Sequence, residues 1–283
     1  MTKISQLISK TKELEREIVL EEKKILKNAI QELQIKLESE DPSVIDMQNK
    51  IIAKQEKDFN SFSLQRDKGI EKLNKILAKL IGRDFNTDDS EHLLLFSSLS
   101  VSSRVPSKIL EIGTADGITA ATLALLFPNS EVVTIDLPID NDKFRMSYDR
   151  AKSFKQYVDK RDRLLNNFEN LTFSAINSIS LNSWSDKSFD LIWVDGAHGF
   201  PVLPLDLYNS FRLIRKGGLV VIDDVFVDLR KLDDMYRSTA AIQTLKLFHK
   251  NDLISNYKLI RKRLSLKFNF KDLNEKFLAV VDF

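Results

Sequence analysis

Cysteine is absent from this 283-residue sequence. A chain without thiols forms no disulfides and offers no thiolate to a metal ion, which excludes a disulfide-stabilised domain and a zinc–thiolate site. Long apolar runs are missing as well. The first ten residues, MTKISQLISK, are too polar for a signal peptide, and no run reaches the roughly 18 apolar residues of a membrane span. We therefore expect a cytoplasmic protein that has no membrane partner.

An excess of charge of one sign is also lacking. The sequence has 43 Lys and Arg against 41 Asp and Glu, a net charge of +2. This balance indicates no nucleic-acid partner, and the two short basic clusters, residues 160–163 and 261–263, are typical of a solvated surface. Hydrophobic residues make up 43% and charged residues 30%, as expected for a globular chain.

Glycine and proline are scarce in the first 82 residues, where only Gly69, Gly82 and Pro42 occur. The rest of this region is rich in residues that favour helices, and its apolar residues recur in alternating steps of three and four, as in a coiled coil. The segment Asp41-Pro42-Ser43 interrupts the pattern, because proline cannot continue a helix and Ser43 is a suitable N-cap. The apolar series comprise Ile4, Leu7, Thr11, Leu14, Ile18 and Ile25 before the break, and Val44, Met47, Ile51, Phe59, Phe62, Ile70, Leu73, Leu77 and Leu80 after it.

These two series predict an antiparallel coiled-coil hairpin of two helices, about 55 Å long at roughly 1.5 Å per residue. A lone hairpin buries little surface, so its apolar stripes need a third surface, from the rest of the chain or from a second copy. We interpret residues 1–82 as a packing and dimerisation arm, which predicts a homo-oligomer. A clamp for a substrate or partner is the alternative.

After a linker, residues 83–107, with one short helix over 91–99, strands and helices alternate. This alternation predicts right-handed βαβ units and a mainly parallel sheet covered on both faces. The last two strands, 257–266 and 277–281, are separated only by a turn-rich stretch, so we expect them to pair antiparallel. Residues 108–283 are therefore predicted to form a Rossmann-like α/β domain with a mainly parallel seven-stranded sheet and an antiparallel last strand. The other expected strands are 109–112, 131–137, 171–176, 189–194 and 219–222, and the expected helices are 119–127, 143–165, 203–214 and 232–249.

Polar side chains stand at the carboxyl ends of the first three strands, the edge where open α/β sheets bind ligands. Residues 113–117 contain two glycines that permit a tight turn, and Glu111, just before them, is placed to meet a cationic amino group. Asp136 ends the second strand, where a carboxylate can accept both hydroxyls of a ribose. The amide of Asn177 and the hydroxyl of Ser178, after the third strand, can reach an adenine edge. A plain strand–helix turn is the alternative.

Four segments, ILEIGTADG, VVTID, SFDLIWVDG and LIRKGGLVVIDD, resemble in order and spacing the successive motifs of the class I S-adenosylmethionine-dependent methyltransferases. The resemblance covers residues 108–283 and implies that S-adenosylmethionine is the cofactor. Ala115 stands where the family's G-x-G-x-G motif has its middle glycine, as is common in the metal-dependent O-methyltransferases of the catechol and caffeoyl-coenzyme A type. The residues implied to bind the cofactor are Glu111, Gly113, Ala115, Asp116, Gly117, Asp136, Asn177 and Ser178.

Three carboxylates and an imidazole are expected at the ends of the next two strands. Asp195 and His198 follow one strand, Asp223 and Asp224 follow the other, and adjacent parallel strands lie about 4.8 Å apart. Carboxylates this close repel one another unless they are protonated or neutralised, and oxygen ligands select a hard cation such as Mg²⁺. The sequence therefore predicts a metal site, and the alternative is that the three carboxylates cap loops and turns.

The arrangement D-x-x-H with a later D-D resembles the macrolide sugar O-methyltransferases of the macrocin and mycinamicin type. That resemblance implies Asp195, Asp223 and Asp224 as metal ligands and His198 as the base, at the place where catechol-type enzymes have a lysine. Imidazole suits a base because its ordinary pKa of about 6.5 leaves it mostly neutral at pH 7. The implied function is divalent-metal-dependent O-methylation of a small molecule with a vicinal diol, such as a sugar.

Two alternatives stay open at this point. One is a metal-independent methyltransferase that acts on a small molecule, a protein or RNA, in which the acidic residues only cap loops. The other is a coiled-coil interaction protein whose methyltransferase fold is not catalytic.

Overall fold

The computed structural model describes residues 41–86, 89–147, 153–228, 238–263 and 275–283. The chain divides into two compact units, Met1–Lys50 with Leu264–Asp272, and Ile51–Arg263 with Leu273–Phe283. In the first unit, Asp41 Oδ1 accepts hydrogen bonds from the backbone N–H of Ser43 at 2.8 Å and from its hydroxyl at 2.6 Å, where helix α2 (Pro42–Ser61) begins. The first predicted helix lies outside the described residues, so the coiled coil and the homo-oligomer stay predictions.

The second predicted helix, residues 44–80, is broken into two. Helix α2 ends at Ser61, Ser63 takes a positive φ of 58°, and α3 (Arg66–Ile81) follows. The prediction of one continuous helix was wrong because Phe62 and Leu64, in the break, are both buried in the same core. Residues two apart on a helix face different sides, so a continuous helix could not direct both side chains inward.

Helices α3 and α4 (Glu91–Ser100) approach one another closely at Gly69. A Cβ at this position would lie 2.1 Å from Ser98 Oγ, so only glycine permits the contact. Leu73 and Leu77 of α3 are fully buried, and they belong to the same hydrophobic cluster as α4 and one face of the sheet. The predicted boundary at residue 82 therefore does not separate two hydrophobic cores. Helix α3 was assigned to the arm and α4 to the linker, but both contribute to the core of the α/β domain.

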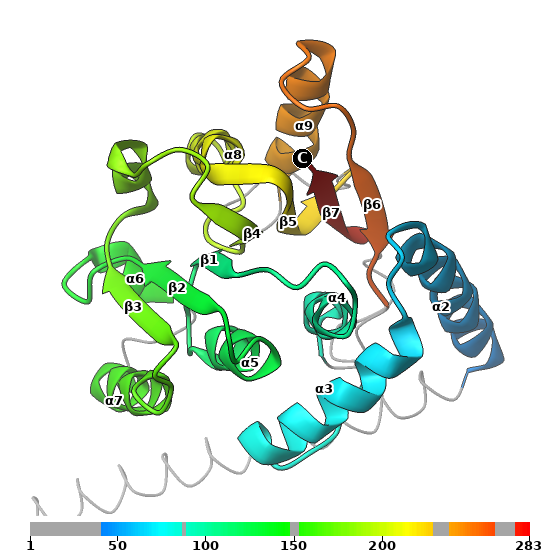
Figure 1. The fold of residues 1–283 in the computed structure, drawn as a ribbon, viewed down its shortest axis with the longest axis horizontal. Helices are drawn as coiled ribbons and strands as arrows, with labels where there is room; N and C mark the ends of the chain where they lie inside the picture. The colour runs from blue at the N-terminus through cyan, green and yellow to red at the C-terminus, as the bar shows by residue number, and fades with distance from the viewer. Residues whose placement is uncertain (1–40, 87–88, 148–152, 229–237, 264–274) are drawn as a thin grey trace, which may run out of the picture. The chain divides into compact units, whose positions relative to one another are not determined.

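The central sheet has seven strands in the order β3-β2-β1-β4-β5-β7-β6 (Figure 1). Neighbouring strands from β3 to β5 are parallel, whereas β7 is antiparallel to both β5 and β6. This order confirms the predicted mainly parallel sheet with an antiparallel last strand. The strands are β1 (Lys108–Ile112), β2 (Glu131–Asp136), β3 (Leu171–Ala175), β4 (Phe189–Val194), β5 (Ile214–Phe226), β6 (Lys258–Arg261) and β7 (Lys276–Asp282).

Helices cover both faces of the sheet, because alternate residues of each strand face opposite sides (Figure 1). Ile109 and Leu191 join the cluster with α3, α4 and α5, whereas Leu110 and Ile192 join the cluster with α8 and α9. The predicted helix 143–165 is described as α6 and α7, with a stretch outside the described residues between them. Within the described ranges, no helix is both long and apolar enough to cross a bilayer. The further helices are α5 (Ile118–Leu126), α6 (Asp142–Met146), α7 (Phe154–Leu165), the 3₁₀ helix η2 (Ser178–Ser183), α8 (Val202–Leu213) and α9 (Ala240–Lys250).

Strand β5 extends beyond its predicted end at residue 222. Its parallel pairing with β4 stops at Val194 and Ile222, and its register against β7 shifts between Ile222 and Val225. Asp223 and Asp224 occupy this bulge, and Asp224 has a positive φ of 45°. The prediction that these aspartates end the strand was wrong, because β7 continues the pairing past them. A bulge re-aims side chains that a regular strand would send to opposite faces.

Candidate active site

The turn after β1 brings the ends of β1 and β4 into contact. Gly113 has a φ of 105°, and a Cβ there would lie 2.2 Å from the carbonyl oxygen of Asp195. The Asp195 N–H donates to the carbonyl of Ile112 at 2.8 Å. Gly117, with a φ of 82°, precedes α5, and a Cβ there would lie 2.8 Å from Leu165. The predicted cofactor turn therefore directly adjoins the predicted acidic cluster.

The carboxylate of Asp136 is held at the end of β2 by backbone amides. The N–H of Ala115, a residue with a φ of 48°, donates to Asp136 Oδ2 at 2.9 Å, and the N–H of Leu137 donates to Oδ1 at 2.7 Å. Asp116 is exposed, and its Oδ1 accepts from the N–H of Ile118 at 3.1 Å at the start of α5. These two amides orient the carboxylate at the end of β2, beside the turn that follows β1.

Glu111 is fully buried beneath this turn. Thr134 Oγ1 donates to Glu111 Oε2 at 2.5 Å, and among the described residues no group hydrogen-bonds to the buried Oε1. Burial raises the pKa of Glu111 to about 8, with Asp136 and Asp116 acting in the same direction and the Thr134 hydroxyl opposing them. A cationic group bound here would satisfy Oε1 and favour the ionised carboxylate.

The two residues predicted to reach the adenine have different surroundings. Asn177 is exposed, and its Oδ1 accepts from the N–H of Ile179 at 3.0 Å, which caps η2. Ser178 lies beside the buried Asp206 of α8. Burial raises the pKa of Asp206 to about 6, and the Ser178 side chain opposes the rise. The adenine role of Asn177 and Ser178 stays a prediction.

The acidic cluster lies where the parallel pairing of β4 with β5 ends. Val194 of β4 pairs with Ile222 of β5, so the residues that follow them, Asp195 and Asp223, lie next to one another. His198 is buried, with its Nε2 3.7 Å from Asp195 Oδ1. Burial lowers the pKa of His198 against the pull of the aspartates of β5, and burial together with Asp223 raises the pKa of Asp195. The structure thus brings the predicted base and carboxylates together.

Lys262 lies between the two aspartates of the β5 bulge. Its Nζ forms an ion pair with Asp223 Oδ1 and donates to Asp224 Oδ1 at 2.8 Å, and its side chain is only 8% exposed. Lys276 Nζ donates to the other oxygen, Asp224 Oδ2, at 2.8 Å. Burial lowers the pKa of Lys262, but both carboxylates together raise it above its ordinary value. Although burial raises the pKa of Asp224, the two lysines hold it below its ordinary value.

These residues, as arranged, do not fit a divalent ion. Within the part of the chain that the structure describes, no group of three or more His, Asp or Glu side chains could hold a metal ion. Mg²⁺ binds oxygens at about 2.0–2.1 Å, and ammonium groups engage Asp223 Oδ1 and both oxygens of Asp224. The arrangement therefore does not support Asp195, Asp223 and Asp224 as the ligands of a metal.

The sequence analysis missed Lys262, and it also missed His92 of α4. Its Nε2 lies 3.3 Å from Thr119 Oγ1 in the first turn of α5, and its ring centroid lies 4.5 Å from that of Trp193 on β4. Burial lowers the pKa of His92 to about 4, against the influence of Asp223. The imidazole thus lies between the cofactor turn and the acidic cluster, and its only signal in the sequence was a histidine within an apolar helix.

The interpretation of the basic clusters as solvated surface holds for the exposed Lys160 and Arg163 but was wrong for Arg161, Lys262 and Arg263. In the segment 261–263, Lys262 is buried in the acidic cluster, and Arg263 Nε is 2.6 Å from the buried Glu91 Oε1. In the segment 160–163, Arg161 is 1% exposed and lies 4.4 Å from the ring of Phe173. Basic side chains in a short run can be buried when a carboxylate or an aromatic ring from elsewhere in the chain packs against them. The run itself does not show whether such a partner exists.

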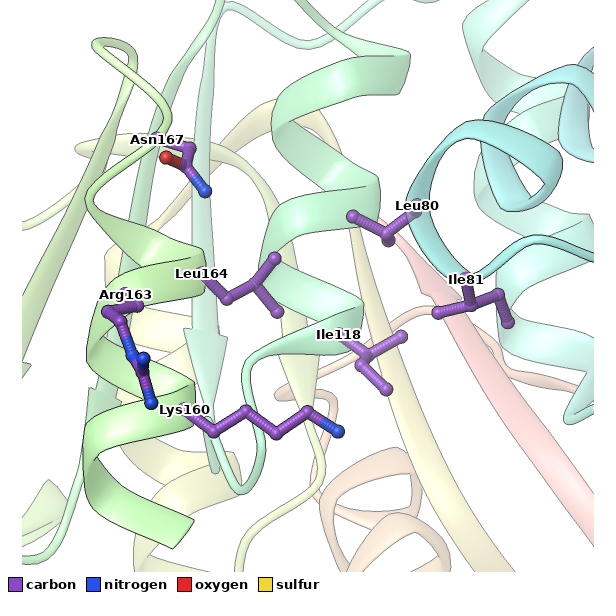
Figure 2. A pocket seen from close by; sticks show the side chains of 7 residues that line it. All are labelled: Leu80, Ile81, Ile118, Lys160, Arg163, Leu164 and Asn167. Carbon is purple, nitrogen blue, oxygen red and sulfur yellow. The ribbon is translucent and has the colours of Figure 1, made fainter. Parts of the chain in front are cut away.

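A separate pocket of about 440 Å³ opens between α3, the start of α5 and α7 (Figure 2). Its walls are mainly apolar, with two cationic side chains at one side, and it contains none of the predicted site residues. It therefore belongs neither to the cofactor turn nor to the acidic cluster. The residues that line it are Leu80, Ile81, Ile118, Lys160, Arg163, Leu164 and Asn167.

Comparison with known proteins agrees with the fold. Residues 110–225 match the model of a family described as a methyltransferase domain, and no curated protein matches the sequence. The chain is similar to cofactor-bound Rv0187 from MTB, at 19% identity over 74% of this chain and 94% of that one, with a TM-score of 0.45. It is also similar to the O-methyltransferase TomG from Streptomyces achromogenes, at 20% identity, 79% and 93% coverage and a TM-score of 0.44. A third similar structure is the N-methyltransferase NodS from Bradyrhizobium japonicum WM9, at 17% identity, 66% and 91% coverage and a TM-score of 0.43.

The match to the family model, the strand order and the glycine turn followed by an acidic residue at the end of β2 agree with one another. Residues 110–225 therefore form a methyltransferase domain.

Proposed function

We propose that this methyltransferase transfers the methyl group to a hydroxyl oxygen of a small molecule bound at the acidic cluster. The observation that carries the proposal is the position of His198. Its buried imidazole lies beside Asp195, and the backbone of Asp195 contacts the cofactor turn. A base at this place can take a proton from an acceptor hydroxyl that faces the methyl donor.

The cofactor end of the proposal rests on groups that suit S-adenosylmethionine. When bound, that cofactor supplies a methyl group on a positively charged sulfur. Glu111 would accept from its ammonium group, because Oε1 is buried with no hydrogen-bond partner among the described residues. Asp136 would accept from the ribose hydroxyls. The turn residues Gly113, Ala115, Asp116 and Gly117, with Asn177 and Ser178, would line the remaining surface.

His198 would act as the base. Its Nε2 takes the proton of the acceptor hydroxyl, and the acceptor oxygen forms a bond to the methyl carbon as the carbon–sulfur bond breaks. The electron pair of that bond stays on sulfur, which becomes a neutral thioether, and His198 later releases its proton to solvent. The main contribution of the protein is to hold oxygen, methyl carbon and base in line.

The acceptor in this proposal is a compound with adjacent hydroxyls, such as a sugar. Asp195 is half-buried at the edge of the cluster and can accept a hydrogen bond from a second hydroxyl next to the reacting one. The resemblance to the macrocin and mycinamicin enzymes also implies a divalent ion at this place, which the arranged residues do not fit.

A product assay tests the proposed function. The full chain is incubated with S-adenosylmethionine and a panel of sugars, nucleotide sugars and catechols, and the products are analysed by mass spectrometry and NMR. We expect one acceptor to gain a methyl group on oxygen, with S-adenosylhomocysteine formed in equal amount. Methylation found only on nitrogen or carbon would overturn the proposal, as would calorimetry that detects no binding of S-adenosylmethionine.

A further inference from the structure

The ammonium of Lys262 lies where a cation shared by Asp223 and Asp224 would have to bind. It contacts one oxygen of each carboxylate, and Lys276 contacts the remaining oxygen of Asp224. Both lysines come from the β6–β7 hairpin, where the N–H of Lys262 donates to the carbonyl of Lys276 at 2.9 Å. This hairpin lies outside the residues that match the family model, so the lysines are delivered by a different part of the chain.

The bulge in β5 makes this shared contact possible. In a regular strand, consecutive side chains point to opposite faces of the sheet. The positive φ of Asp224 and the register shift between Ile222 and Val225 change that alternation. As a result, the neighbouring carboxylates of Asp223 and Asp224 both reach one ammonium group.

The charges of these four groups are balanced. Two carboxylates, on Asp223 and Asp224, face two ammonium groups, on Lys262 and Lys276. A divalent ion at the same oxygens would have to displace Lys262, whose side chain is 8% exposed. The displaced ammonium would then be buried without its counter-charges, and breaking a buried ion pair in this way is strongly unfavourable.

We infer that Lys262 takes the place of the divalent ion, and that this methyltransferase works without a metal. The inference rests on the proposed function, which places the acceptor hydroxyl at the acidic cluster. An ammonium has three N–H bonds, so Lys262 can hold both aspartates and donate a hydrogen bond to the acceptor oxygen. As that oxygen loses its proton to His198 and attacks the methyl carbon, Lys262 keeps its own protons and stabilises the developing negative charge.

Titration with Mn²⁺ alone tests the first part of the inference without any substrate. By calorimetry and by electron paramagnetic resonance, we expect the full chain to show no saturable Mn²⁺ site in the cluster. Lys262→Met should create such a site, because two carboxylates lose their cation, and adding Asp223→Asn should remove it again. Lys258→Met is the matched control, because Lys258 lies at the start of β6, four residues before Lys262, but donates to Ser61 Oγ at 2.8 Å.

Several outcomes would overturn the inference. One is a wild-type chain that binds Mn²⁺ at a site that Asp223→Asn abolishes. Another is a Lys262→Met chain that keeps its circular dichroism spectrum and still binds no Mn²⁺. If Lys262→Met does not fold, the wild-type titration decides the question by itself, with Asp223→Asn as its comparison.

Turnover tests the second part once an acceptor is known. We expect the wild-type rate to be unchanged in excess chelator, and Lys262→Met to lower kcat by about 10²–10³, as removal of one hydrogen-bond donor to a developing oxyanion does. Activity that chelator abolishes and Mn²⁺ restores would overturn the inference. The two proposals fail separately, because an error about the acceptor leaves the Mn²⁺ titration unchanged.

Discussion

The cofactor end and the acceptor end of this site hold buried carboxylates in opposite ways. At the cofactor end, Glu111 has one oxygen bound by a threonine hydroxyl and, among the described residues, a second buried oxygen without a partner. At the acceptor end, Asp223 and Asp224 are engaged by the chain's own lysines. The first arrangement suits a cationic ligand that binds reversibly. The second already contains a cation, the ammonium group of Lys262.

This difference predicts how substitutions divide between binding and turnover. Changes at the cofactor end should weaken binding of S-adenosylmethionine, and changes at the acceptor end should lower the rate while the cofactor still binds. If a substitution at the acceptor end weakened cofactor binding, or one at the cofactor end lowered only the rate, the two ends would not be distinct.

The largest effect is expected for the base. His198→Ala should lower kcat by about 10²–10⁴, the usual contribution of a positioned base, and should leave the calorimetric Kd for S-adenosylmethionine unchanged. His249→Ala is the control, because that ring lies on α9 next to Ile254. A His198→Ala enzyme with wild-type turnover would remove this residue from the mechanism.

The buried carboxylate of Asp206 should make stability depend on pH. Folding raises the pKa of Asp206 from 3.8 to about 6, so the folded chain binds this proton more tightly than the unfolded chain does. The corresponding stability, about 3 kcal/mol, is present below about pH 4 and is lost as the pH rises through about 6.

Asp206→Asn should therefore unfold at a higher urea concentration than the wild type at pH 7 and at a similar concentration near pH 4. Asp159→Asn, an exposed position on α7, should change little at either pH. An Asp206→Asn variant that is less stable than the wild type at pH 7 would mean that the ionised carboxylate has a stabilising partner.

Removal of Asp136, the carboxylate that we propose binds the ribose, should have the next largest effect. Asp136→Ala should weaken binding of S-adenosylmethionine by roughly 1.5–3 kcal/mol, the scale of charge-assisted hydrogen bonds. Asp140→Ala, at an exposed position four residues further along, and Asp223→Asn should leave that affinity close to the wild-type value. Equal losses at Asp136 and Asp223 would contradict the division between the two ends.

The contact that joins the two ends can be tested with a pair of glycines. Gly113 and Gly217 both have a positive φ, but a Cβ at Gly113 would lie 2.2 Å from the Asp195 carbonyl, whereas one at Gly217 would meet nothing within 4 Å. Gly113→Ala should therefore destabilise the chain by about 1–3 kcal/mol more than Gly217→Ala does, as overpacking usually does. Urea unfolding measures this difference, and equal losses would show that the backbones of the two ends are not in contact.

The sequence by itself predicted the residues that we propose for the cofactor end, and it determined the mainly parallel sheet with its antiparallel last strand. The glycine turn, Glu111 and Asp136 each belong to a short contiguous segment that contains a strand and the turn after it. Parallel βαβ units then place the ends of such strands at one edge. For the same reason, Asp195 and His198 could be predicted to lie near Asp223, because Asp195 follows β4 directly and Asp223 comes where the parallel pairing of β5 with β4 ends.

Only the tertiary structure decided what those carboxylates contact. Lys262 is separated from Asp224 by 38 residues, and an antiparallel hairpin brings it there, together with a bulge that local sequence does not specify. His92 and the core residues of α3 reach the domain through helices that looked like a linker and an arm. Their positions depend on a shared hydrophobic cluster. Burial and charge pairing between distant segments are properties of the whole fold, so no local pattern could show that the cation at this site is a lysine.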